Sequence, residues 1–183
     1  MIEKTLARRY AAALLHVTEK AGTATIHDTE ETLNALKVVY NRDSHFRGLL
    51  HSPKVPKAVK KQLLRRILAG ASPALQKFGD ILIDKNRADI LPEVADSYER
   101  LADDFEGIVR VKVLSAFAVT PDQEARLKGS IERVFKRKCI LESKVVRTLK
   151  GGLQIHIGDE VVDGTLAYRL KSLRDKLHEL QKR

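Results

Sequence analysis

The chain of 183 residues carries 34 Lys and Arg against 24 Asp and Glu, which gives a net charge of +10 and a pI near 9.8. Apolar residues make up 43% of the sequence, enough to bury a core, so a wholly disordered chain is excluded. Cys139 is the only cysteine, which excludes an intramolecular disulfide and a CxxC metal or redox motif.

The sequence does not predict a membrane span. The longest segment without a charged side chain, residues 67–76, has 10 residues, whereas a spanning helix needs ~20 apolar residues. The N-terminal segment carries an acidic side chain at Glu3 and has no small-residue cleavage site after an apolar stretch, so it is not typical of a signal peptide. We therefore expect a soluble, cytoplasmic protein with no direct membrane insertion, which can still associate with a membrane complex.

Before residue 106, apolar residues recur at spacings of three and four, the pattern of consecutive amphipathic helices. The first helix places Ile2, Leu6, Tyr10, Ala13 and Val17 on the face expected to meet the core. Start signals for five more helices are a capping pair at Asp28 and Glu31, a cap at Asp43 or Ser44, and prolines at positions 56, 73 and 92. Their core-facing side chains are expected to be Leu33, Leu36, Tyr40, Phe46, Leu49, Leu50, Val59, Leu63, Ile67, Leu75, Phe78, Leu82, Val94, Tyr98, Leu101 and Phe105. Short polar connections predict a six-helix antiparallel bundle over residues 1–105.

From residue 106 the pattern becomes mixed. A strand follows Gly107, with Val109, Val111 and Val113 on one side, and Thr120-Pro121 opens a helix whose expected inner residues are Leu127, Ile131 and Val134. A second strand over residues 144–149 is predicted to turn at Gly151-Gly152 and to return as residues 153–157, because a Gly pair between two such runs favours a β-hairpin. After Asp163-Gly164-Thr165, a last amphipathic helix carries Leu166, Leu170, Leu173, Leu177 and Leu180. The predicted class is α+β, with residues 106–183 forming a small α/β domain.

No motif predicts catalysis. None of the six histidines has HxxxH or HExxH spacing, and the glycines at positions 151, 152 and 158 fall between predicted strands rather than in a phosphate-binding loop. Asp159, Glu160 and Asp163 form an acidic cluster that could be considered for Mg²⁺. A turn followed by a helix cap explains that cluster equally well. We predict no metal and no cofactor, and an enzyme is the weakest of the function classes.

A basic segment of the chain allows two interpretations. Its members are Lys54, Lys57, Lys60, Lys61, Arg65 and Arg66. Such a run could hold phosphates in a salt-dependent manner, and this makes a basic RNA-binding or ribosome-associated module the alternative function. No aromatic side chains for base stacking are interleaved with these charges. The favoured interpretation is the solvated face of an amphipathic helix.

The first helix has a second apolar strip, made mostly of small side chains. Its members are Ala7, Ala11, Leu14 and Thr18. Small residues let another helix approach closely, so the strip could border a groove for an amphipathic partner helix. The other interpretation, favoured by spacing alone, is a helix buried on two sides within its own bundle.

Three segments carry a resemblance to a known family. The strongest is GGLQIHIGDEVVDGTLAYRL at 151–170, and the weaker two are ARRYAAALL at 7–15 and LIDKNRADILPEVADSY at 82–98. The three segments follow one another along the chain as they do in that family, and the similarity covers nearly the full length. The chain resembles the delta subunit of F-type ATP synthase, which is similar to the mitochondrial oligomycin-sensitivity-conferring protein. One departure is Ala167-Tyr168, where members of the family often carry more basic or smaller residues.

The resemblance implies a non-catalytic stator subunit that links the α₃β₃ head to the peripheral stalk, so that proton-driven rotation is coupled to ATP synthesis. It implies that the N-terminal bundle binds the N-terminal helices of alpha subunits in a groove between the first and fifth helices. The residues expected in this groove are Ala7, Tyr10, Ala11 and Leu14 on one wall and Phe78, Leu82 and Lys85 on the other.

The resemblance also implies that the C-terminal domain binds b-type stalk subunits. The positions expected to take part are Gly158, Asp159, Asp163 and Arg169, together with the last helix. The protein would lie peripherally at the cytoplasmic face of the bacterial inner membrane, in a hetero-oligomeric complex without nucleic acid. Residues 1–105 carry 17 basic and 14 acidic side chains, a difference of +3, whereas residues 106–183 carry 17 and 10, a difference of +7. The basic excess therefore lies mainly in the half expected to bind the stalk, where it could orient docking to an acidic partner.

Overall fold

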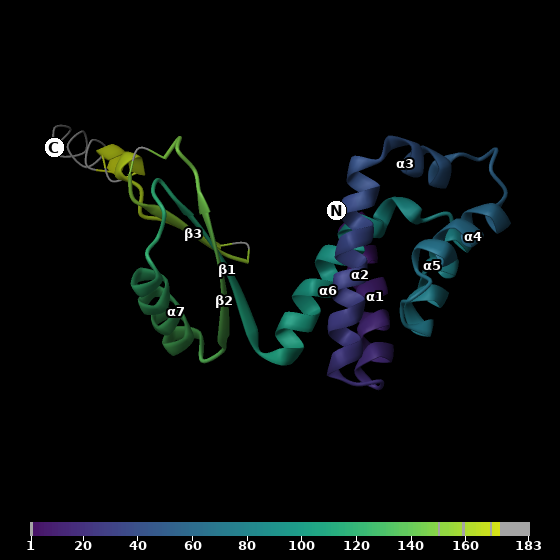
Figure 1. Cartoon of the computed structure of the whole chain (residues 1–183), viewed down its shortest axis with the longest axis horizontal. Coiled ribbons are helices and arrows are strands. Elements are labelled where there is room, and N and C mark those ends of the chain that lie inside the picture. The colour runs from purple at the N-terminus through teal and green to yellow at the C-terminus, as the bar shows by residue number, and fades with distance from the viewer. Residues whose placement is uncertain (1, 150, 159, 169, 173–183) are drawn as a thin grey trace. The chain divides into compact units, whose positions relative to one another are not determined.

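The computed structural model describes residues 2–149, 151–158, 160–168 and 170–172 (Figure 1). The chain divides into two compact units, Met1–Ala102 and Asp103–Arg183, here called unit 1 and unit 2. The change of pattern expected at residues 105–106 lies just after this division.

The first part of the chain is helical. Its elements are α1 (Ile2–Glu19), α2 (Thr23–Arg42), α3 (Ser44–His51), α4 (Lys57–Ile67), α5 (Pro73–Asp84), the short 3-10 helix η1 (Ala88–Ile90) and α6 (Leu91–Glu106). The Asp43 carboxylate caps α3 by accepting the backbone N–H groups of His45 and Phe46 at 2.8 and 3.1 Å. The Ser72 hydroxyl caps α5 by accepting the N–H of Leu75, directly before Pro73. The expected start at Asp28 is wrong, because α2 begins at Thr23 after Gly22.

The core of unit 1 contains most of the predicted side chains, among them Leu33, Leu36, Tyr40, Phe46, Leu50, Leu75, Phe78, Leu82, Val94 and Tyr98. The prediction for α1 is wrong for Ala13 and Val17, whereas Leu6 and Tyr10 are partly buried against the core as expected. Ala7, Ala11, Leu14 and Thr18 are buried, whereas Ala13 and Val17 are exposed. Both faces of α1 are apolar, so the spacing could not decide which one turns inward. The face with the smaller side chains is buried because it lets the neighbouring helices approach closely.

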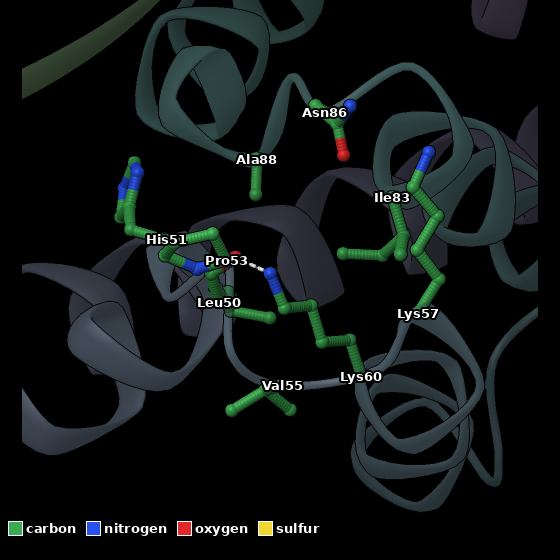
Figure 2. Close-up of a pocket in the computed structure, with 9 residues that line it drawn as sticks. All are labelled: Leu50, His51, Pro53, Val55, Lys57, Lys60, Ile83, Asn86 and Ala88. Carbon is green, nitrogen blue, oxygen red and sulfur yellow. Dashed lines mark hydrogen bonds between the residues drawn. The ribbon is translucent and has the colours of Figure 1, made fainter.

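The prediction for α4 is also wrong. Lys60 and Leu64 are its buried residues, and Val59 and Ile67 are largely exposed. The Lys60 ammonium donates a hydrogen bond to the Leu50 carbonyl oxygen at 2.6 Å (Figure 2). A lysine can bury its methylene stem while its ammonium reaches a backbone acceptor, so a charged residue takes a core position here. In α6, Phe105 is likewise half-exposed rather than inward-facing.

Unit 2 contains a four-stranded mixed sheet and confirms the α+β class. Its elements are β1 (Ile108–Ser115), α7 (Pro121–Phe135), β2 (Lys138–Val145), β3 (Leu153–Ile157) and β4 (Glu160–Asp163). The strand order is β2-β1-β3-β4, with β1 parallel to β2 and antiparallel to β3. Val109, Val111 and Val113 are buried as predicted. Thr120 caps α7 with Gln123 in a capping box, and Ile131 faces the core whereas Val134 is exposed.

The predicted hairpin at Gly151-Gly152 is wrong. The second strand runs over Lys138–Val145 and pairs only with β1 among the described strands, while residues 153–157 pair with the other edge of β1 and with β4. The hairpin of unit 2 is instead β3–β4, in which Ile157 pairs with Glu160. The alternation of side chains identified β1 and β3, whereas the second strand was expected at residues 144–149 and β4 was not expected, and alternation carries no information about which strand is the neighbour.

Of the predicted last helix, only residues 166–168 and 170–172 belong to the described part of the chain. These residues are helical. Leu166 and Leu170 are exposed, and Leu173, Leu177 and Leu180 of the predicted stripe lie outside the described residues. In the parts of the chain that are described, no helix is both long enough and apolar enough to cross a bilayer.

Candidate functional site

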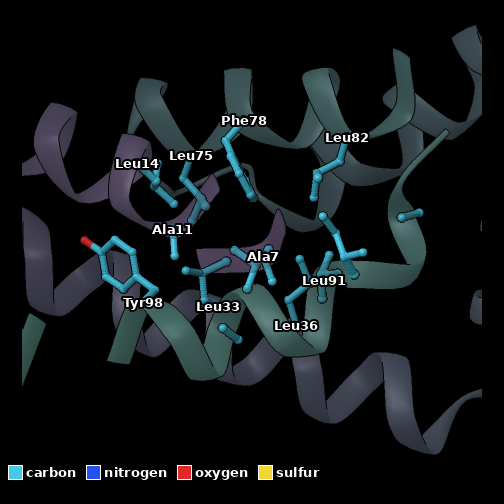
Figure 3. Packing of buried hydrophobic residues seen from close by; sticks show 14 of the residues in the cluster. Ala7, Ala11, Leu14, Leu33, Leu36, Leu75, Phe78, Leu82, Leu91 and Tyr98 are labelled. Atoms are coloured by element: carbon cyan, nitrogen blue, oxygen red, sulfur yellow. The ribbon is translucent and has the colours of Figure 1, made fainter. Parts of the chain in front are cut away.

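The α1 and α5 helices pack side by side in unit 1. The Tyr10 and Phe78 rings meet edge to face, with centroids 6.1 Å apart and planes at 72°. Figure 3 shows Leu14 beside Leu75 at one end of the pair, and Ala7 lying towards the Leu82 end. The two helices predicted to form a partner groove are therefore neighbours.

The α1 wall predicted for this groove lies mostly in the interior. Ala7 and Ala11 have no exposed surface, and Leu14 retains only 4%. Figure 3 shows that α1 runs between α5 on one side and the core residues of α2 and α6, including Leu33, on the other. These three side chains are therefore not accessible to a docking helix, so this strip packs within the bundle, whereas Ala13 and Val17 of the other apolar strip are exposed.

The predicted α5 wall is divided in the same way. Leu82 and Phe78 belong to the core, whereas Lys85 is exposed. Gly79 also packs inward: a Cβ atom placed on it would lie 3.4 Å from Cδ1 of Leu68. The inner side of α5 is therefore committed to packing within the bundle.

The outer sides of the two helices carry a different set of residues, which we call the α1–α5 face. Its members are Leu6, Tyr10, Ala13 and Val17 of α1, Ala74, Lys77 and Ile81 of α5, and the adjoining Lys85. Val17 is 53% exposed and Ile81 is 40% exposed, whereas Tyr10 is half-buried. From their spacing in the sequence, the four α1 residues of this face are expected to face the core, and Ile81 has no predicted role. The sequence signal that could have identified this face is the presence of two apolar strips on α1, of which only one can pack closely against neighbouring helices.

Tyr10 is held in place by three contacts from two residues, Phe78 and Arg87. Besides its contact with Phe78, it accepts a hydrogen bond at its hydroxyl from Nη1 of Arg87 at 3.1 Å. The guanidinium carbon of Arg87 also lies 5.8 Å from the centroid of the Tyr10 ring, within the range of a cation–π contact. Tyr10 is therefore a positioned aromatic side chain at the centre of the α1 contribution to the face.

Arg87 owes its position to the end of α5. Asn86 has a left-handed φ of 53°. The N–H of Arg87 donates to the Leu82 carbonyl oxygen at 2.9 Å, and the N–H of Asn86 donates to the Ile83 carbonyl oxygen at 3.1 Å. This is a Schellman ending, in which Asn commonly takes the left-handed position. An Asn-Arg pair after the last turn of a predicted helix could have indicated this geometry from the sequence.

The basic segment of α4 makes contacts within unit 1. Lys57 donates to the backbone carbonyl of Asp84 at 2.7 Å, and the Lys61 ammonium pairs with the Asp84 carboxylate at 2.7 Å. Arg65 pairs with Asp80 through two nitrogens, the shorter contact being 2.6 Å. These partners account for much of the segment as intramolecular structure, but the favoured amphipathic face is wrong in detail, because Lys60 is buried and Val59 and Ile67 are exposed.

The predicted stalk-binding positions surround the β3–β4 hairpin. Gly158 is exposed in the turn with a φ of 59°, whereas Asp159 and Arg169 lie outside the described residues. The Asp163 carboxylate accepts the N–H of Thr165 at 2.9 Å, and the Thr165 hydroxyl accepts the N–H of Tyr168. Hydrogen bonds from the Thr165 hydroxyl and N–H lower the pKa of Asp163 below its ordinary value. Thr165 is therefore the helix cap, and Asp163 fixes the turn before it.

The glycines at positions 151 and 152 allow two backbone segments to pack closely together. Gly152 has a φ of 82°, and a Cβ atom on it would lie 2.4 Å from the Gly164 carbonyl oxygen and 2.9 Å from Cα of Thr165. The N–H of Gly164 donates to Leu153, and the N–H of Leu166 donates to Gly151, both at 3.0 Å. Glycine is required because the start of β3 lies directly against the start of the last helix.

Comparison with known proteins identifies the family. The family model described as "ATP synthase delta (OSCP) subunit" matches residues 6–177, nearly the whole chain. The chain belongs to the ATP synthase delta (OSCP) family. An ATP synthase subunit delta from Desulfitobacterium hafniense is 34% identical over 97% of this chain and 98% of its own length. Another, from Trichlorobacter lovleyi, is 31% identical over 98% and 99%, respectively.

The fold of this delta-family chain also occurs in a solved structure. A chain of the Toxoplasma gondii mitochondrial ATP synthase hexamer superimposes with a TM-score of 0.67, covering 94% of this chain and 97% of that chain at 21% identity. Membership of the delta (OSCP) family makes the protein a non-catalytic subunit of the ATP synthase stator. The comparisons give no support to the RNA-binding alternative.

Proposed function

We propose that this delta-family subunit joins the catalytic head of an ATP synthase to its peripheral stalk through two separate surfaces. Unit 1, acting as one antiparallel bundle of six helices, binds the N-terminal helices of alpha subunits. Unit 2 binds b-type stalk subunits. The complex lies at the cytoplasmic face of the bacterial inner membrane, with this subunit bound peripherally. The observation that carries the proposal is the exposed apolar α1–α5 face on a chain of this family.

The α1–α5 face has the properties of a receptor for an amphipathic helix. Two neighbouring helices supply apolar side chains along their outer sides, and a helix of 18 residues such as α1 is about 27 Å long. Such a length can meet anchors spaced at i, i+3, i+4 and i+7 on a partner helix. Tyr10 offers a rigid aromatic contact, while Lys77 and Lys85 favour acidic side chains at the edge of the partner. Ala7, Ala11 and Leu82, which the sequence predicted as direct contacts of the partner helix, lie beneath this face and support it.

Binding to isolated F1 tests this surface. Val17→Asp and Ile81→Asp each put a charge into the proposed contact, and we expect each to weaken binding at least tenfold because a buried carboxylate without a partner is strongly unfavourable. Val38→Asp is the matched control, because Val38 is an exposed valine of α2 with 47% of its surface accessible. Calorimetric titration gives the affinities, and circular dichroism verifies folding. Unchanged affinity in both variants, with the control also unchanged, would remove the α1–α5 face from the proposal.

Unit 2 is suited to an acidic stalk partner. With Asp103 and Asp104 included, unit 2 carries 17 basic and 12 acidic side chains, a net charge of +5. The β3–β4 hairpin presents an exposed turn at Gly158, with Asp163 fixing its far end. We assign the stalk contact to this turn with Asp159, to Arg169 and to the last helix. Basic surfaces accelerate and orient docking to acidic partners, and this effect weakens as salt screens the charges.

Charge reversal tests the stalk contact. Lys128 and Lys144 are exposed in unit 2, and Lys20 is an exposed lysine of unit 1. We expect Lys128→Glu with Lys144→Glu to slow association with the soluble part of the b subunits several-fold at low salt, with Lys20→Glu leaving the rate unchanged. Association that is insensitive to both salt and charge reversal would contradict the electrostatic part of the proposal. Coupled ATP synthesis in membranes reconstituted with F1 and each variant then measures the consequence for the stator.

A further inference from the structure

A cavity of about 450 Å³ opens in unit 1, away from the α1–α5 face. It lies where the end of α3, the connection from α3 to α4, the start of α4 and the segment after α5 come together (Figure 2). Leu50, Val55, Ile83 and Ala88 provide much of its apolar lining, and Lys57 and Lys60 provide the charges. None of the residues that line it is acidic.

Lys60 is the unusual member of this lining. Its residue surface is only 7% exposed. Its ammonium donates to the Leu50 carbonyl oxygen at 2.6 Å, and Figure 2 shows the nitrogen in the middle of the residues that surround the cavity. An ammonium group has three N–H donors. Within the described part of the chain, no carboxylate pairs with Lys60, so its charge is buried against a neutral acceptor.

Lys57 adds a second cation at the exposed rim. Its ammonium donates to the backbone carbonyl of Asp84 at 2.7 Å. The Asp84 carboxylate pairs with Lys61 at 2.7 Å and also interacts with the charge of Lys57, so it offsets part of the charge at the rim, but it does not pair with Lys60. Hydrogen bonds from Lys61, together with the neighbouring lysine charges, lower the pKa of Asp84, so that carboxylate is ionised and already engaged. The cavity therefore keeps a net positive lining.

A buried cation without a counter-ion is unfavourable, since a carbonyl dipole or a water molecule satisfies hydrogen bonds but does not neutralise the charge. An anion that enters the cavity would neutralise the charge of Lys60. The volume lies within the range of about 300–1,000 Å³ that is usual for small-molecule sites. The cavity is larger than a single carboxylate or phosphate group, and its aliphatic lining suits an apolar portion of the same ligand.

We propose that this cavity binds a small organic anion, a carboxylate or phosphate monoester with a short apolar portion. Lys60 pairs with the anionic group, Lys57 donates to it from the rim, and Leu50, Val55 and Ile83 contact the apolar portion. The site is independent of the stator surfaces, because none of its lining residues belongs to the α1–α5 face or to unit 2.

The experiment is an NMR titration of the full-length protein labelled with ¹⁵N, at constant ionic strength. The probes are butyrate, acetate, butyramide and inorganic phosphate. We expect butyrate to give saturable shifts at the amides of Leu50, Val55 and Lys60, and to bind more tightly than acetate, which lacks the apolar chain, and than butyramide, which lacks the charge. Tighter binding of butyrate than of phosphate would assign the site to carboxylates, and the reverse order would assign it to phosphate esters.

Two variants test the role of the lysines. Lys60→Met retains the stem and removes the charge, and we expect it to weaken butyrate binding at least tenfold. Lys54→Met removes a charge from the same connection outside the lining and should bind as the wild type does. If Lys60→Met does not fold, Lys57→Gln takes its place, with an expected loss of about threefold. Wild-type affinity for butyrate in Lys60→Met, or in Lys57→Gln where that variant takes its place, would overturn the proposal. The absence of saturable shifts with both butyrate and inorganic phosphate in the wild type would also overturn it.

Discussion

Arg87 donates a hydrogen bond to the Tyr10 hydroxyl at 3.1 Å while its guanidinium lies 5.8 Å from the centroid of the same ring. The two residues come from opposite ends of the sequence of unit 1, and the Schellman ending of α5 places the arginine beside α1. An exposed apolar face is thus built around a tyrosine whose orientation is fixed before any partner binds. Such preorganisation reduces the conformational entropy lost on binding.

Removing Arg87 should therefore loosen Tyr10. We expect Arg87→Met to raise the rate of dissociation from F1 several-fold, because the tyrosine must then be ordered during binding. A double-mutant cycle with Tyr10→Phe should give a coupling energy of about 1 kcal/mol for the hydrogen bond, because phenylalanine retains the ring that Arg87 contacts. Surface plasmon resonance measures the rates. Arg66→Met, at an exposed arginine of α4, is the control, and equal dissociation rates for the Arg87 and Arg66 variants would contradict the positioning role.

Gly152 should not tolerate a side chain. Its positive φ and the 2.4 Å distance from a Cβ atom to the Gly164 carbonyl oxygen require the backbone of Gly152→Ala to shift. We expect this substitution to destabilise unit 2 by about 2–4 kcal/mol, measured by chemical unfolding. Gly129→Ala is the matched control, because Gly129 lies within α7, where a Cβ atom meets nothing within 4 Å. It should stabilise the helix by up to about 1 kcal/mol, and a similar small effect for Gly152→Ala would show that this contact is not required.

The lowered pKa of Asp163 makes part of the stability of unit 2 dependent on pH. Because folding lowers this pKa from 3.8, the ionised carboxylate stabilises the folded state above the ordinary pKa, and the contribution is lost as the pH falls through the lowered pKa. Asp163→Asn should therefore lower the Tm at pH 7, and its difference from the wild type should shrink below about pH 4.

Thermal unfolding over a series of pH values measures this effect. Glu142→Gln, at an exposed position of β2, provides a carboxylate control that should not reproduce it. A difference between Asp163→Asn and the wild type that stays constant from pH 7 to pH 2 would contradict an electrostatic origin.

Local signals in the sequence predicted much of the fold correctly. The caps at Asp43, Ser72 and Thr120 start the helices at which they were expected, because a side-chain oxygen can satisfy free N–H groups only at a helix start. The alternation of valines in β1 identified its buried side in the same direct way. The segment 151–170 carried the strongest resemblance to the family, and the structure explains Gly152 by its close approach to Gly164.

The tertiary structure decided everything that depended on a neighbour distant in the sequence. Periodicity shows which residues of α1 share a face, but both faces are apolar, and only packing against α2, α5 and α6 selects Ala7 and Ala11 for the interior and leaves Val17 outside. Strand alternation likewise could not reveal that residues 153–157 pair with β1 rather than with the preceding strand. Lys60 shows the same limit, since its charge predicts exposure until the Leu50 carbonyl and the cavity beside it are known. The sequence by itself determined most of the helices, the strands β1 and β3 and the family, because capping, side-chain spacing and characteristic segments are local, whereas it misplaced β2 and did not predict β4. Which surfaces remain free for a partner or a ligand depends on long-range packing, and only the tertiary structure decided them.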